Sequence, residues 1–99
     1  MIINMSFKHM DSSDAIREYA TEKTEKLKKY FDGKIHVTWA FSVEKLDKIA
    51  HCHLVGNHMD YFGESAKPTL QESIDDSLDK IEKQLRKHKE IVKNRLHKH

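Results

Sequence analysis

This 99-residue sequence has one cysteine, no long apolar run and almost no net charge. The lone Cys52 cannot form a disulfide within the chain, and no basic-then-apolar signal segment opens the sequence. Both absences favour a reducing compartment, so we expect a cytoplasmic protein. The longest apolar runs fall far short of the ~20 residues that a membrane-spanning helix needs.

The charged residues balance over the whole chain but not along it. The sequence has 18 Lys and Arg against 16 Asp and Glu, which gives a formal net charge of +2. Residues 80–99 contain eight basic and two acidic residues, whereas residues 1–79 have a net charge of −4. A basic segment in a nearly neutral chain is typical of proteins that bind nucleic acid or an anionic membrane surface.

The composition predicts one folded domain that spans residues 1–99. Hydrophobic residues make up 37% of the chain, which is low for a globular protein, but the aromatic content and the periodicity argue against disorder. A domain of this size has a single core and buries roughly 60–65% of the surface of the unfolded chain. No repeat or low-complexity tract divides it.

Alternation of apolar and polar residues at period two predicts four strands, each with one buried and one wet face. The clearest pattern runs from Ile35 to Val43 and puts Trp39 on the core side. Gly56-Asn57-His58 is a hairpin turn signal before the last strand, in which Gly63 predicts a bulge or an edge position. The four predicted strands cover residues 2–9, 34–43, 49–55 and 59–65.

Apolar residues at spacings of three and four predict two helices. The first begins after Ser12 or Ser13, either of which can cap it, and ends at Gly33. At the start of the second, Thr69 and Glu72 have the spacing of a capping box. Its apolar seam continues nearly to the C-terminus and consists of Leu70, Ile74, Leu78, Ile81, Leu85, Val92 and Leu96, with His88 at the one polar step.

The element order is therefore β-α-β-β-β-α, which places the protein in the α+β class. The simplest arrangement that buries two amphipathic helices is a two-layer sandwich. We expect both helices on one face of a mainly antiparallel four-stranded sheet, with the other face exposed to water.

A basic stripe is expected along the second helix. At 100° per residue, Lys80, Lys83 and Lys87 lie opposite the apolar seam or to one side of it, flanked by Gln84. Acidic residues are almost absent after Glu82, and like charges four residues apart destabilise a helix by roughly 0.2–0.5 kcal/mol per pair. This uncompensated repulsion indicates an anionic partner. Three further basic residues flank the stripe on its other side, namely Arg86, Lys89 and Lys93.

The first helix adds Arg17, Lys23 and Lys26 as candidate contacts. Lys23 lies beside the apolar face, so its stem can follow the groove between the helices and present its ammonium next to the second helix. Favourable i,i+4 pairs explain part of the charge of this helix structurally. These pairs are Glu22 with Lys26 and Glu25 with Lys29.

Structured RNA suits this surface better than a membrane does. A membrane would compete with the sheet for the same Leu and Ile residues of the second helix. Lysines and arginines on a rigid helical platform can instead span the phosphates of folded RNA by shape. On the pattern alone, an ordinary solvated helix face is the plain alternative.

Other chemistry has weak support in the sequence. His51 and His53 share a strand face while Cys52 points to the opposite one, which gives at most the start of a metal site that His36 and His58 could join. The acidic residues do not converge as a catalytic pair would. We therefore expect no metal, no cofactor, no catalytic residue and no small-molecule substrate.

With these patterns in view, the chain resembles the short ribosome hibernation-promoting factors, relatives of the ribosome-associated inhibitor that are also known as sigma-54 modulation proteins. The resemblance covers essentially the whole chain. The family's fold is β-α-β-β-β-α and is similar to a double-stranded-RNA-binding domain, in agreement with the order derived from periodicity. Residues 14–31 resemble the family's first helix and residues 74–90 its second, including Asp79, Lys80, Lys83, Gln84, Leu85, Lys87 and Lys89.

The resemblance implies a translation regulator and no catalysis. Its expected partners are the small ribosomal subunit and its ribosomal RNA, in the channel used by messenger and transfer RNA, in starved or stationary-phase cells. A generic structured-RNA-binding or protein-interaction module without a ribosomal role is the alternative. Taken with the basic stripe, the RNA-binding residues that we expect are Arg17, Lys23, Lys26, Lys80, Lys83, Gln84, Arg86, Lys87 and Lys89.

The sequence departs from the family where the second helix begins. Pro68-Thr69-Leu70 stands in place of the usual Asp-Met-Tyr, so the usual Asp cap and the Tyr contact are absent, although Thr69 and Glu72 can replace the cap. The chain also has neither the acidic tail of the inhibitor subgroup nor the extra dimerisation domain of the long forms. By resemblance, this favours the short type, which helps to pair ribosomes together with a separate ribosome modulation factor.

Overall fold

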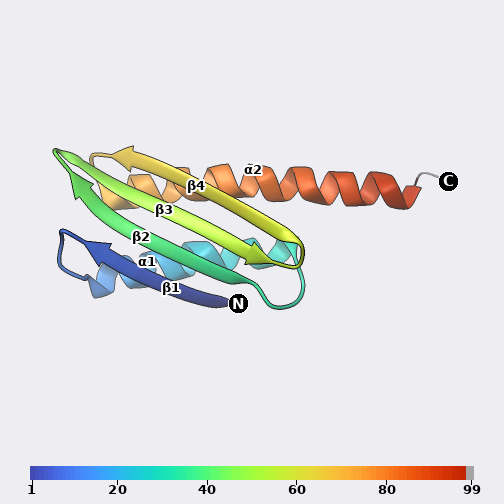
Figure 1. The fold of residues 1–99 in the computed structure, drawn as a ribbon, viewed down its shortest axis with the longest axis horizontal. Coiled ribbons are helices and arrows are strands. Elements are labelled where there is room, and N and C mark those ends of the chain that lie inside the picture. The colour runs from blue at the N-terminus through green and yellow to red at the C-terminus, as the bar shows by residue number, and fades with distance from the viewer. Residues whose placement is uncertain (98–99) are drawn as a thin grey trace.

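The computed structural model describes the backbone of residues 1–97 and the side chains of residues 1–89. Its four strands and two long helices follow the predicted order, which gives an α+β fold (Figure 1). The elements are β1 (Ile2–Lys8), α1 (Asp14–Glu25), a short 3-10 helix η1 (Lys26–Tyr30), β2 (His36–Glu44), β3 (Asp47–Gly56), β4 (Met59–Lys67) and α2 (Leu70–His97).

The strands form one mixed sheet in the order β1-β2-β3-β4. β1 is parallel to β2, while β2 with β3 and β3 with β4 are antiparallel. Both helices cover the same face of the sheet, and α2 continues beyond the ends of the strands (Figure 1). The predicted two-layer arrangement is therefore confirmed. It leaves β1 and β4 as edge strands and one face of the sheet uncovered.

The hydrophobic core lies between the sheet and the helices. Trp39 is fully buried there as predicted, and its indole nitrogen donates to the hydroxyl oxygen of Thr24 at 3.0 Å. Burial raises the pKa of the Cys52 thiol, which faces the same core. The side chains of Val92 and Leu96, predicted to extend the seam of α2, lie outside the described residues. The described part of that seam is buried as predicted and consists of Leu70, Ile74, Leu78, Ile81 and Leu85.

α2 and β4 pack closely because small residues meet between them. Gly63 pairs with Cys52 in an unbroken ladder, so there is no bulge at this position. Of the two alternatives expected for Gly63, the edge position is confirmed, because β4 is an edge strand. A Cβ atom on Gly63 would lie 2.4 Å from the carbonyl oxygen of Ser77. The buried hydroxyls of Ser73 and Ser77 donate to carbonyl oxygens of β3. These contacts fix the position of α2 over the sheet.

Both helices begin as predicted, but the first ends early. Ser13 caps α1 and Thr69 caps α2, each accepting a hydrogen bond from the backbone N–H three residues later, at 3.3 and 3.2 Å. The prediction that the first helix continues to Gly33 is wrong, because the α-helix ends at Glu25 and η1 follows. The tighter 3-10 geometry is common at helix ends, and it still buries Leu27 in the core.

Candidate nucleic-acid interface

α2 presents different side chains on its two sides. Its rotation of about 100° per residue separates the side chains that project toward β4 from those that project toward α1. Lys80 and Gln84 project toward β4, and Lys83 and Lys87 lie next to them on the outer side of the helix; we call these four residues the β4-side flank. The second set is the α1-side flank, and it consists of Asp75, Asp79, Glu82, Arg86 and Lys89.

Two residues of the β4-side flank cover the free edge of the sheet. The Lys80 ammonium donates to the carbonyl oxygen of Glu64 at 2.6 Å, and Gln84 donates through Nε2 to the carbonyl oxygen of Phe62 at 2.9 Å. Lys80 also pairs with Asp76 at 3.4 Å. A hydrogen bond from the Ser65 hydroxyl, helped by Lys80, lowers the pKa of Asp76. Lys80 and Gln84 are therefore positioned by contacts with β4.

Lys83 and Lys87 on the same flank are exposed. Neither forms an ion pair with any side chain among residues 1–89. Because α2 is fixed on the sheet, the backbone positions of these two lysines are held about one helical turn apart, and their side chains extend into solvent without an ion pair among residues 1–89.

The α1-side flank is instead held by a charged network around Glu82. The Tyr30 hydroxyl donates to the Glu82 carboxylate at 2.6 Å, and Arg86 and Lys29 approach the same carboxylate at 3.0 and 3.8 Å. The hydrogen bonds from Tyr30 and Arg86 lower the pKa of Glu82. Arg86 also donates through Nε to the Tyr30 hydroxyl at 3.3 Å, and the same two partners raise its pKa. Arg86 is thus committed to contacts within the protein.

A second contact joins the helices near the start of α2. The Tyr19 hydroxyl donates to the carboxylate of Asp75, with oxygen distances of 2.7 and 2.9 Å. Burial, followed by this hydrogen bond and the negative charge of Asp75, raises the pKa of Tyr19 to about 12. Tyr19 and Asp75 therefore hold α1 against α2 at the opposite end from Glu82.

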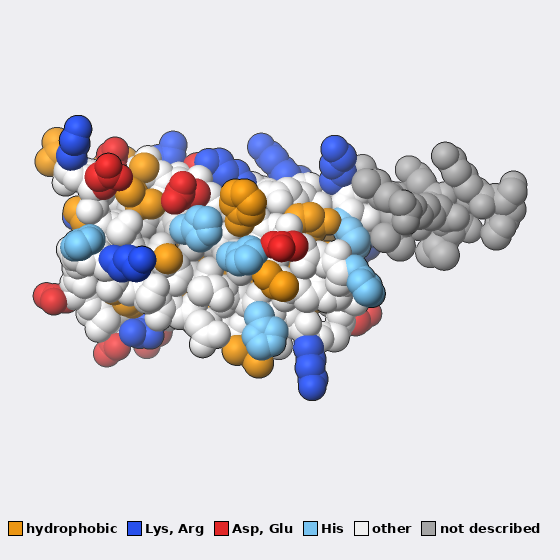
Figure 2. Space-filling model, viewed as in Figure 1, with side chains coloured by type: hydrophobic (Ala, Val, Ile, Leu, Met, Phe, Trp, Pro, Cys, Tyr) orange, Lys and Arg blue, Asp and Glu red, His pale blue; other side chains and the backbone are white. Residues whose placement is uncertain are grey.

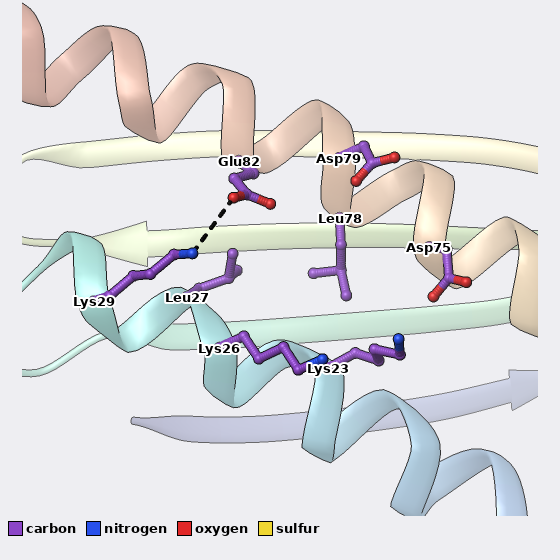
Figure 3. Close-up of a pocket in the computed structure, with 8 residues that line it drawn as sticks. All are labelled: Lys23, Lys26, Leu27, Lys29, Asp75, Leu78, Asp79 and Glu82. Atoms are coloured by element: carbon purple, nitrogen blue, oxygen red, sulfur yellow. Dashed lines mark ion pairs between the residues drawn. The ribbon is translucent and has the colours of Figure 1, made fainter.

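Between these two contacts lies a cleft with walls of opposite charge (Figure 3). The predicted position of Lys23 is confirmed, because it lines this cleft with its ammonium 5.4 Å from the centre of the Tyr19 ring. Lys29 points across to Glu82 and does not pair with Glu25 as predicted, nor do Glu22 and Lys26 form an ion pair. One wall, formed by α1 and η1, contributes Lys23, Lys26 and Lys29, and the α2 wall contributes Asp75, Asp79 and Glu82.

Two of the predicted basic residues, Arg17 and Lys89, lie away from both the cleft and the β4-side flank. The Arg17 guanidinium lies 5.1 Å from the centre of the Phe7 ring and borders a depression lined by acidic residues of α1. Lys89 lines a groove formed with Tyr30 and the β3–β4 turn. The nine predicted residues therefore do not form one continuous patch, and the β4-side flank brings together four of them.

Glu82 was not predicted from the sequence to be the centre of the network with Tyr30, Lys29 and Arg86. The i,i+4 spacing of Glu82 and Arg86 could have indicated that pair. Tyr30 and Lys29 could not be assigned to it, because they approach from η1, more than 50 positions away in the sequence. The network shows why Arg86 is less free to bind a ligand than its place beside the basic stripe suggested.

The histidines of β3 lie where the alternation predicted. His51 and His53 are half-buried on the uncovered face of the sheet, and Cys52 between them is in the core. Among the described residues, no three His, Cys, Asp or Glu side chains are grouped to hold a metal ion. No helix in the described part of the chain has an apolar stretch long enough to cross a membrane.

Comparison with known sequences gives a family match over most of the chain. Residues 3–93 match the family described as sigma 54 modulation protein / S30EA ribosomal protein. The ribosome hibernation promoting factor of Azotobacter vinelandii is 32% identical over 90 residues, which cover 91% of this chain and 84% of the relative. The factor of the same name from Klebsiella oxytoca is 30% identical over 93 residues, which cover 94% of this chain and 98% of the relative.

Comparison with solved structures supports the fold. The crystal structure of the N-terminal domain of Thermus thermophilus Protein Y superposes with a TM-score of 0.83. The match covers 89% of this chain and 99% of that domain, at 24% sequence identity. The arrangement of two helices on a four-stranded sheet is therefore shared with this structure.

Proposed function

The chain belongs to the sigma 54 modulation protein / S30EA ribosomal protein family, and on that premise we propose that it is a ribosome hibernation factor. It binds the small ribosomal subunit in the channel used by messenger and transfer RNA, and so blocks translation in stressed or stationary-phase cells. The relatives named ribosome hibernation promoting factor support a role on the ribosome.

The observation that carries the proposal is that two lysines on the outer side of α2 form no ion pair with any side chain among residues 1–89. Lys83 and Lys87 are exposed without an ion pair among residues 1–89, while Lys80 and Gln84 beside them are anchored to β4. Binding to phosphates releases condensed counterions, so ammonium groups that need not first break internal pairs gain most from RNA. The rigid flank would contact the backbone of folded ribosomal RNA by shape.

The other predicted residues have graded roles in this proposal. Lys23 and Lys26 line the cleft and can approach RNA that bridges the two helices, although the acidic wall opposite them reduces their attraction for phosphate. Lys89 would contact RNA from the groove that it lines with Tyr30 and the β3–β4 turn. Arg86 positions Tyr30 and Glu82, and Arg17 would make a separate contact from the far side of α1.

We propose no catalytic activity, and we place the protein in the cytoplasm, where ribosomes are. Residues 1–99 act as a single ribosome-binding domain. By family resemblance the protein would act with a separate ribosome modulation factor when inactive ribosomes pair. No cofactor or small-molecule substrate is needed, because the proposed action is to occupy a channel.

Sedimentation of purified ribosomal subunits with the protein tests the proposal. We expect co-sedimentation with the small subunit and inhibition of translation in a reconstituted system. Binding to free RNA without co-sedimentation would favour the alternative, a generic RNA-binding module. Lys83→Glu with Lys87→Glu should weaken co-sedimentation strongly, and Lys45→Glu with Lys48→Glu, at the other end of the sheet, is the matched control. Equal losses in the two variants would indicate general charge and not this surface.

A further inference from the structure

The uncovered face of the sheet is a second surface with a different composition. Phe62 projects from it with 61% of its surface exposed, and Val55 and Ile2 are also exposed there. Figure 2 shows this face, with His, hydrophobic and acidic side chains at its centre and a row of Lys and Arg along the edge where α2 lies. Phe62 belongs to the edge strand β4, so this exposed aromatic ring lies beside the free edge of the sheet.

Phe62 is held between two acid–histidine pairs. His51 stacks against the Phe62 ring, with centroids 6.0 Å apart and an interplanar angle of 23°. His51 also lies 3.7 Å from Glu64, and His53 is hydrogen-bonded to Asp60 at 2.5 Å. The contacts order the side chains around Phe62 and place one carboxylate on either side of it along β4. The exposed strip therefore reads acidic, aromatic, acidic at alternate positions.

The formal charge of this face argues against RNA as its ligand. The outward positions of the four strands carry one lysine, Lys8, and four carboxylates. Even with the three outward histidines all protonated, the positive charges would only balance the negative ones, so the face offers phosphate no net attraction. A second copy docked through the same face would bring together two surfaces that each carry four carboxylates and one lysine, so the charges of the two copies are not complementary. The four carboxylates are Glu44, Asp47, Asp60 and Glu64, and the three histidines are His36, His51 and His53.

We propose that this face docks an extended basic segment of another protein. In an extended chain, alternate side chains recur about every 6.6–7 Å on one side, which is also the spacing of Asp60, Phe62 and Glu64 along β4. A segment with Arg or Lys, an apolar residue, and Arg or Lys at positions i, i+2 and i+4 matches this strip in both charge and period. The apolar residue packs on Phe62, and the cationic groups pair with the carboxylates. The proposal does not depend on ribosome binding.

Titration of the isotope-labelled full-length chain with a peptide containing Arg-Ser-Leu-Ser-Arg, followed by NMR, tests this inference. We expect saturable shifts of the backbone amides around His51 and Phe62. Asp60→Lys with Glu64→Lys should raise the dissociation constant about tenfold or more. Phe62→Ala should also weaken binding. Glu22→Lys with Glu25→Lys, on the outer side of α1, matches the charge change, and Leu46→Ala, in the β2–β3 turn, matches the loss of an exposed apolar residue. Both controls should leave the affinity unchanged.

The remaining outcomes would overturn the proposal. Shifts of the backbone amides around Phe62 on addition of a single-stranded oligouridine would assign the face to RNA. Concentration-dependent shifts there without peptide would assign it to a second copy of the chain. Peptide shifts confined to Asp75, Asp79 and Glu82 would mean that acidity alone attracts the peptide. Absence of saturable shifts would exclude this partner chemistry. Failure here with intact co-sedimentation would leave the proposed function untouched.

Discussion

The two flanks of α2 are anchored by different kinds of contact. Toward β4, the helix backbone approaches Gly63 directly, and Lys80 and Gln84 donate to backbone carbonyl oxygens. Toward α1, the anchors are hydrogen bonds and ion pairs to the carboxylates of Asp75 and Glu82. Among the described residues, one carboxylate, that of Asp76, pairs with an anchoring residue toward β4, whereas toward α1 the anchors are themselves carboxylates and Glu82 pairs with Arg86 and Lys29. Lys83 and Lys87, which form no ion pair among residues 1–89, therefore lie beside the less acidic of the two flanks.

The largest loss of stability is expected from a substitution at the close contact between β4 and α2, where Gly63 meets the backbone of Ser77. Gly63→Ala would place a Cβ atom 2.4 Å from the Ser77 carbonyl oxygen, so α2 must move away from β4. Overpacking of this kind costs about 2–3 kcal/mol of unfolding free energy. Urea denaturation measures the loss. Gly33→Ala is the control, because its φ of +95° strains the backbone but no atom lies within 4 Å of the added Cβ. A larger loss at Gly33 would show that the contact with Ser77 is readily relieved.

Charge reversal on the β4-side flank and on the basic wall of the cleft should affect small-subunit binding unequally. Lys83→Glu with Lys87→Glu should reduce the affinity by about tenfold to a hundredfold and lower the salt dependence, the slope of log K against log salt, by about 2. Lys26→Glu with Lys29→Glu should have a smaller effect, because Lys29 already faces Glu82 at 3.8 Å. Binding assays over a series of salt concentrations measure both quantities. Equal slopes for the two variants would remove the distinction between the β4-side flank and the basic wall of the cleft.

The fold could be predicted from the sequence because its signals are local. Period-two and period-3.6 patterns gave the strands, the α2 seam to Leu85 and the burial of Trp39, and the caps at Ser13 and Thr69 follow from hydroxyls just before apolar periods. The 3-10 turn after Glu25 was not predicted, since the apolar spacing to Leu27 fits either helix type.

The site was only partly predictable, because contacts between distant segments determine which basic side chains are already bound within the protein. Helical spacing placed Lys83 and Lys87 together, but it could not show that Lys80 is bound to the backbone of Glu64 or that Arg86 is bound to Tyr30. A basic residue in the sequence is a candidate for RNA binding only until its internal partners are known.

Removal of the charge on Glu82 should loosen the α1-side flank. Glu82→Gln should destabilise the protein by about 1–2 kcal/mol at neutral pH, since the carboxylate accepts from Tyr30 and pairs with Arg86. Because folding lowers the pKa of Glu82 from its ordinary 4.5, its stabilisation is complete above that pH and is lost as the pH falls through the lower folded value. Thermal unfolding across this acidic window should be less pH-dependent in the variant than in the wild type. Glu22 is exposed and serves as the control. An equal reduction in the pH dependence of unfolding in Glu22→Gln would contradict the assignment of this dependence to Glu82.

The smallest effect is expected at the other contact between the helices. Tyr19→Phe removes the hydrogen bond to Asp75 and should cost about 1 kcal/mol, since the bond is only partly buried. Folding raises the pKa of Tyr19 from 10.0 to about 12, so the stability linked to its protonated form is present below pH 10 and is lost as the pH rises toward 12. Ultraviolet titration of the folded protein should show one late-ionising tyrosine that is absent in the variant. Asp75→Asn should lower this pKa only in part, because burial is the largest cause of the shift. A complete return to the ordinary value in Asp75→Asn would mean that the carboxylate, and not burial at the contact between α1 and α2, controls Tyr19.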